Sequence, residues 1–102
     1  MNVTNATQTS LLRPTTGDVG QKLTVEDVVL QFSAFLAATA FVLLTVDTKA
    51  VRVTFDGTDP DATVGTYLPA GTVLWLSKEA ATAAKFHQVD AAATVYASPF
   101  TN

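Results

Sequence analysis

The feature that most constrains this chain is an alternating segment that runs directly into a turn. From Val51 to Asp56 apolar and polar residues alternate, and Gly57 and Pro60 follow at once. This period of two predicts a strand with one buried and one solvated face. Such strands are typical of antiparallel sheets, and Asp, Gly and Pro are the residues that turns favour. The segment therefore predicts an antiparallel β protein.

Similar short segments recur along the chain. Strands are predicted at about 29–36, 40–46, 50–56, 71–77, 85–89 and 92–97, with Pro99 ending the last one. Both faces of 71–77 are apolar, so both are expected to be covered. Ser77 predicts the N-cap of a short alanine-rich helix over 77–84. The fold class expected is all-β, a small antiparallel β-sandwich of immunoglobulin-like or jelly-roll-like type. The predicted core contains Phe41, Leu43, Val51, Val53, Phe55, Leu74, Leu76 and Val95.

The composition limits the functions open to the chain. Its 102 residues are the size of one domain, and the absence of cysteine excludes disulfides, a thiol nucleophile and a thiolate metal site. Six Lys and Arg against nine Asp and Glu give a net charge of −3, which offers no basic patch for nucleic acid. Only 15% of the residues are charged, against about 25% in ordinary domains. So few charges, with 48% apolar residues, indicate that other protein covers part of the surface.

Residues 28–46 carry no charged side chain and have the length of a membrane-spanning helix. Polar residues such as Gln31 and Thr39 interrupt them, no Lys or Arg flanks either end, and Val, Phe and Thr favour strands. We therefore predict two strands and no membrane span. The N-terminus also lacks the basic and apolar pattern of a signal peptide.

The chain is predicted to divide into an arm, residues 1–20, and a β-sandwich domain, residues 21–102. The arm is rich in Thr, Asn, Ser and Gly and shows no periodicity, so it cannot bury enough apolar surface to order by itself. We expect it to order only against neighbouring chains, with Leu11 and Leu12 as anchors and Arg13 reaching a carboxylate. This predicts a homo-oligomer within a larger assembly.

Catalytic candidates are few. His87 is the only histidine, and Ser77, Ser98 and Asp90 are partners by residue type alone, because no known catalytic motif surrounds them. His87 lies at an exposed position of its predicted strand. We predict that the protein is not an enzyme and has no catalytic, cofactor-binding or metal-binding residues.

Two other sets of residues have a functional and a structural interpretation. Asp56, Asp59 and Asp61 have the alternate spacing of calcium ligands, but an EF-hand glutamate is missing, and Asp before Gly or Pro is ordinary in turns. A turn is the preferred interpretation. Trp75 and Tyr67 could form a platform for sugar rings, but a tryptophan in an apolar strand is more often part of a core.

Residues 51–77 resemble a segment common in structural proteins of tailed bacteriophages, and also the immunoglobulin-like domain of some chitobiases. The matching positions are Asp56, Gly57, Thr58, Pro60, Gly65, Ala70 and Gly71, whereas Asp61 stands where the phage pattern more often has Thr. The resemblance covers about a quarter of the chain. It implies a protein located in the virion, most simply a capsid cement or decoration protein whose partners are the major capsid protein or other virion proteins. A head-tail adaptor, tail or fibre-base component is one alternative, and a carbohydrate-binding module for host attachment is another.

Overall fold

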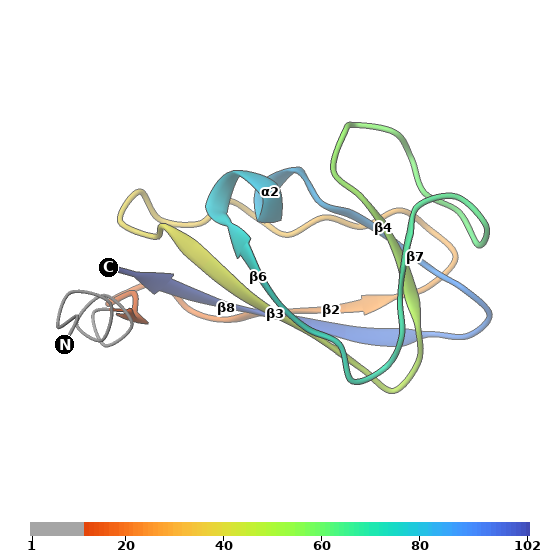
Figure 1. Ribbon diagram of the computed structural model, residues 1–102, viewed down its shortest axis with the longest axis horizontal. Coiled ribbons are helices and arrows are strands. Elements are labelled where there is room, and N and C mark those ends of the chain that lie inside the picture. Colours follow the sequence, from red (N-terminus) through yellow and green to blue (C-terminus); the bar gives the residue numbers. More distant parts are fainter. Residues whose placement is uncertain (1–11) are drawn as a thin grey trace, which may run out of the picture.

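The computed structural model describes residues 12–102, which form two antiparallel sheets and one short helix (Figure 1). The larger sheet has the order β1-β8-β3-β6, and β2 also pairs with β8. The smaller sheet has the order β5-β4-β7. The strands of the larger sheet are β1 (Arg13–Pro14), β2 (Gln21–Val25), β3 (Phe41–Asp47), β6 (Val73–Ser77) and β8 (Ala93–Thr101). Those of the smaller sheet are β4 (Val51–Thr54), β5 (Thr66–Leu68) and β7 (Lys85–Gln88), and the helix is α2 (Lys78–Ala83). The predicted all-β, sandwich-like fold is confirmed.

The core lies between the two sheets. It takes side chains from the inward faces of both. The most deeply buried of these, each 3% exposed or less, include Val42, Leu44, Val46, Val51, Val53, Phe86, Val95 and Ala97. Phe32 packs edge-on against Phe86, with 5.4 Å between the ring centroids. Burying one side chain of this size stabilises the fold by about 1.5–3 kcal/mol, so this cluster is the main source of stability.

The predicted core was wrong about β3. Phe41 and Leu43 were expected inside, but they are only half-buried and point to the outer face, whereas Val42 and Leu44 are fully buried. Both faces of β3 are apolar, so its alternation does not reveal which face turns inward. Pairing with β8 decides the face, because a shift of one residue would turn every side chain over.

The predicted core was also wrong about Phe55, which is 38% exposed. Strand β4 ends at Thr54, two residues before the expected limit at residue 56. Thr54 is buried instead, and its hydroxyl donates a hydrogen bond to the Thr58 carbonyl. This bond holds the following loop over the end of β4, so the alternation does not continue to Phe55.

The strand expected at 29–36 is absent. Leu30 forms an isolated bridge in which its N–H and carbonyl exchange hydrogen bonds with Phe86, and Phe32 and Phe35 insert their rings into the core. The Gln21 side chain holds the same segment by bonding the backbone N–H and carbonyl of Ser33. Residues 26–30 therefore lie along the edge of β7. Within residues 12–102, no helix is long and apolar enough to cross a membrane.

Part of the expected arm is integrated into the domain. Strand β1 pairs with Phe100 and Thr101 of β8, and Thr15 N–H donates to the Pro99 carbonyl at 3.1 Å. The Thr39 hydroxyl lies 2.6 Å from the Asp18 carboxylate and 3.0 Å from the Thr15 hydroxyl. The prediction that the arm orders only against neighbouring chains is therefore wrong for residues 12–20. Residues 1–11, with the proposed anchor Leu11, lie outside the described residues.

Strand β8 passes through Pro99 and ends at Thr101, although Pro99 was expected to stop it. The Pro99 carbonyl faces the edge where Thr15 donates to it, and a residue in a strand directs its N–H and carbonyl to the same edge. The nitrogen of Pro99 therefore faces the gap between β2, which pairs with β8 up to Ala97, and β1, which pairs with β8 from Phe100. Proline has no N–H to donate, and none is needed in this gap because no strand pairs with β8 there.

The helix was predicted correctly. Helix α2 begins after Ser77, whose side-chain oxygen accepts a hydrogen bond from Ala80 N–H at 3.1 Å. Ala81 is fully buried in the core, and the helix lies beside β6 (Figure 1). Its short, small side chains let it lie against β3 and β6.

Candidate interaction surface

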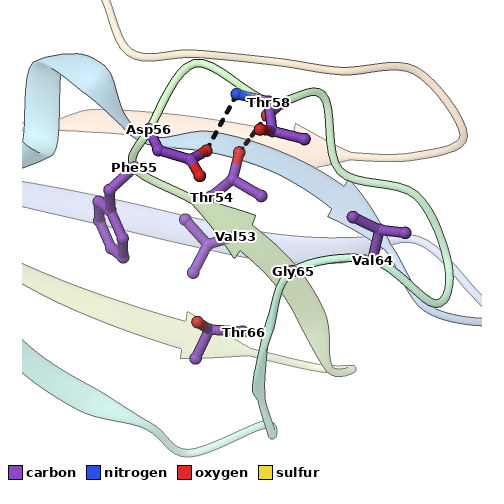
Figure 2. A pocket seen from close by; sticks show the side chains of 8 residues that line it. All are labelled: Val53, Thr54, Phe55, Asp56, Thr58, Val64, Gly65 and Thr66. Carbon is purple, nitrogen blue, oxygen red and sulfur yellow. Dashed lines mark hydrogen bonds between the residues drawn. The ribbon is translucent and has the colours of Figure 1, made fainter.

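The loop between β4 and β5 borders an open pocket of about 410 Å³ (Figure 2). Its lining comes from the end of β4, both ends of the loop and the start of β5: Val53, Thr54, Phe55, Asp56, Thr58, Val64, Gly65 and Thr66. Asp56 is the only titratable side chain among them. The lining is therefore mostly apolar and hydroxyl-bearing, and it offers no pair of acid and base groups for catalysis.

The carboxylates of this loop turn to different partners. Asp56 accepts a hydrogen bond from Thr58 N–H at 3.0 Å, and Asp61 accepts from Thr63 N–H at 2.7 Å and Val64 N–H at 2.8 Å. The turn interpretation of both residues is confirmed. Asp59 forms an exposed ion pair with Lys85 at 2.9 Å. Within residues 12–102, no group of three or more His, Asp or Glu side chains is arranged to hold a metal ion.

These hydrogen bonds favour the charged form of each carboxylate. The bond from Thr58 N–H lowers the pKa of Asp56, and the bond from Thr63 N–H lowers the pKa of Asp61. Gly57, between them in the sequence, has a φ of +89°, a conformation common for glycine in the kind of turn that was predicted here. An added β-carbon at Gly57 would meet no atom within 4 Å, so the constraint there is conformational and not steric crowding by neighbours.

The catalytic candidates do not converge. His87 is half-buried on β7, and its Nδ1 lies 2.6 Å from the neighbouring Gln88 carbonyl. Ser77 caps α2, and Ser98 lies on β8 in the other sheet. Asp90 is exposed between β7 and β8. The structure therefore brings no nucleophile to His87 among these candidates, and the absence of catalysis stays a prediction.

The two proposed sugar-stacking aromatics lie on different sheets. Tyr67 is on β5, where the Arg52 guanidinium sits 5.1 Å from its ring centroid. Trp75 is on β6 and is 48% exposed, so the expectation that it belongs to a core was wrong. They cannot form one platform.

The outer face of β8, β3 and β6 carries an uncharged and largely apolar surface. The register of β8, β3 and β6 sets three rows of side chains that point the same way. We call these nine residues the outer patch: Tyr96, Thr45 and Val73; Ser98, Leu43 and Trp75; Phe100, Phe41 and Ser77. None is charged. Val73 is 64% exposed and Trp75 is 48% exposed, so the outer face of β6 is not covered within the described chain, contrary to expectation.

The outer patch is ordered by its own contacts. The Trp75 ring meets Phe100 edge-on, with 5.0 Å between centroids, although β3 separates their strands. The indole therefore lies back across β3 and leaves its other side open. Sequence reasoning did not identify this surface, although the apolar residues at alternate positions of 41–45 and 73–77 were its signal.

Comparisons with protein-family models, with characterised proteins and with solved structures found no match to this chain.

Proposed function

We propose that this chain is a non-enzymatic structural protein of a bacteriophage virion, and specifically a capsid cement or decoration protein that bridges capsid subunits. The observation that carries the proposal is the outer patch. It presents Trp75, Tyr96 and Val73 to the outside on a rigid sheet with no charge among its nine residues. Protein interfaces are enriched in aromatic residues and depleted of charge at their centres. The resemblance of residues 51–77 to phage structural proteins supports the virion as the setting.

In this role the outer patch would lie on the shell and the apolar contact would add to the cohesion of neighbouring capsid subunits. Trp75 is the expected anchor, because a partly exposed indole held by Phe100 loses little conformational freedom on binding. The loop pocket lies at the β4–β5 end of the other sheet and is not needed for this contact. The same surface would serve an adaptor or tail component equally, so the position in the particle needs a measurement.

The test uses particles made from the genome that encodes this chain. Quantitative mass spectrometry of purified particles should find the chain in a fixed ratio to the major capsid protein. A few copies per particle would instead assign it to the tail or neck. Absence from intact particles would overturn the virion proposal.

A rebinding experiment tests the surface. Particles that lack the chain are mixed with purified protein, with Trp75→Ala or with Tyr67→Ala. Tyr67 is a matched control because it is 50% exposed and lies on the other sheet. Trp75→Ala should lose most of the binding and Tyr67→Ala should retain it. Equal binding by both variants would exclude the outer patch as the contact.

The carbohydrate-binding alternative has one observation in its favour, which is the open side of the Trp75 ring. Sugar recognition also needs polar groups around the ring, and only hydroxyls such as Ser77 and Ser98 are nearby in the rows. Retention on immobilised host polysaccharide that is lost in Trp75→Ala, with no binding to particles, would favour this alternative.

A further inference from the structure

Strand β6 forms an open edge of the larger sheet. Its inner neighbour is β3, and within residues 12–102 no strand pairs with its other side. Val46 N–H donates to the Thr72 carbonyl, and Lys78 N–H donates to the Ala40 carbonyl. These bonds continue the β3–β6 register, so alternate residues of β6, Leu74 and Leu76, direct their backbone groups to β3.

The other residues of β6 direct their backbone groups outward. These are Val73 and Trp75, together with the N–H of Ser77, whose carbonyl is committed to α2 as an N-cap. The side chains of Val73 and Trp75 are 64% and 48% exposed, so α2 does not cover this side of the strand. β6 therefore presents a row of donors and acceptors beside an apolar surface, which is a template for another strand.

The other edges of the described chain are protected. β1 carries Arg13 and Pro14, and β2 carries the exposed Lys22. β5 has only three residues. The edge of β7 is occupied by residues 26–30, since Leu30 bonds Phe86 and the Glu26 carbonyl accepts from Gln88 N–H. Charge, proline, shortness and covering segments are the means by which sheet edges avoid pairing, and β6 shows none of them.

We infer that β6 pairs with β6 of a second copy of this chain, antiparallel across a two-fold axis at Trp75. The sequence of β6 is Val-Leu-Trp-Leu-Ser, which has no charge, so two copies meet with no like charges opposed. The edges formed by β1 and β2 carry positive charges on residues 13 and 22 and would not match it as well. Pairing with those edges would place a charged side chain beside the apolar residues of β6, whereas a second β6 places none there.

The geometry defines one register. Because Trp75 directs its N–H and carbonyl outward, two Trp75 residues can exchange both hydrogen bonds, and Val73 then lies opposite Ser77 of the second copy. Ser77 N–H would donate to the Val73 carbonyl across the axis. This isologous contact uses the only open edge of each described chain, so it closes at a dimer and does not grow into a fibre. It also joins the two outer patches into one surface. The inference rests on the edge alone and does not depend on a role in the virion.

The first test measures the oligomeric state of the purified chain by sedimentation over a range of micromolar concentrations. The wild type should be a dimer that dissociates on dilution. Val73→Lys places a charge on the open edge at an exposed position and should be monomeric, with unchanged circular dichroism. The matched control is Val28→Lys, which makes the same change at a site 57% exposed and away from β6. A monomeric wild type, or a Val73→Lys protein that still dimerises, would overturn the inference.

The second test measures the register. The chain has no cysteine, so a single introduced cysteine can form a disulfide only with a second copy. In a hydrogen-bonded pair the two Cα atoms at position 75 lie about 5.5 Å apart, which suits a disulfide. At position 73 the two equivalent atoms lie about 13 Å apart or more, since four residues separate them along the strand. Mild oxidation should therefore cross-link Trp75→Cys and leave Val73→Cys uncross-linked. Equal cross-linking of both, or of neither, would contradict the two-fold pairing.

Discussion

The two faces of β3 carry the same kind of side chain and meet different surroundings. Leu44 points between the sheets and is fully buried, whereas the adjacent Leu43 points to the outer patch and is only half-buried. Burial in the core explains Leu44 by its contribution to folding. Burial between the sheets does not explain why Leu43, Trp75 and Val73 are apolar, because they lie on the other face. The inner face therefore maintains the fold, and the outer face is the surface on which the proposed contact with other molecules rests.

The largest expected effect compares two phenylalanines. Phe86→Ala should reduce the free energy of unfolding by about 3–5 kcal/mol, because Phe86 is fully buried and its loss leaves a cavity. Phe55→Ala should cost about 1 kcal/mol, since that ring is partly in solvent. Urea denaturation followed by circular dichroism measures both. Similar losses for the two variants would show that the inward and outward positions are wrongly distinguished.

The adjacent leucines of β3 make a closer comparison. Leu44→Ala should cost about 2–5 kcal/mol, and Leu43→Ala about 1 kcal/mol. The same substitution one residue apart isolates the effect of the face. The measurement should be made at a concentration where the chain is monomeric, so that loss of a dimer contact at Leu43 does not add to the result. A larger loss at Leu43 would reverse the assignment of inner and outer faces.

The loop after β4 extends the comparison to a region held by backbone geometry and hydrogen bonds. Gly57→Val should cost about 1–2 kcal/mol, because a β-branched residue is strained at positive φ. Asp59→Asn should cost less than about 1 kcal/mol, since it breaks only an exposed ion pair with Lys85. Thermal melting of both variants checks the order. Calcium that raises the melting temperature of the wild type at micromolar concentration would show that the loop carboxylates bind metal.

The smallest effect is the response of the loop to acid. The pKa of Asp61 is lowered in the folded protein by the bond from Thr63 N–H, so the folded state holds its proton less tightly than the unfolded state. This contribution is present above the ordinary aspartate pKa of about 3.9 and is lost as pH falls through the lower folded value. The Thr63 amide resonance should titrate with a midpoint below about 3.9, and Asp61→Asn should abolish that titration. A midpoint at or above this value would contradict the hydrogen bond.

Local patterns predicted those features whose causes lie within a few residues. The Ser77 cap needs only the next turn of α2, and the positive φ of Gly57 needs only the turn between Asp56 and Thr58. Strand β4 was recognised because its outward residues are polar. Segments apolar on both sides gave no such guidance. Residues 28–36 were expected to be a strand, but their backbone bonds and aromatic contacts are made with distant residues such as Phe86.

Short-range patterns were enough to identify an antiparallel β protein and to locate the turn and the helix start, because alternation, capping and glycine conformations act over a few residues. Three features could be read only from the folded chain: the face of β3 that turns inward, the joining of residues 12–20 to the domain, and the continuation of β8 through Pro99. These features depend on pairing between strands far apart in the chain. The same pairing assembled the outer patch and left the edge of β6 open.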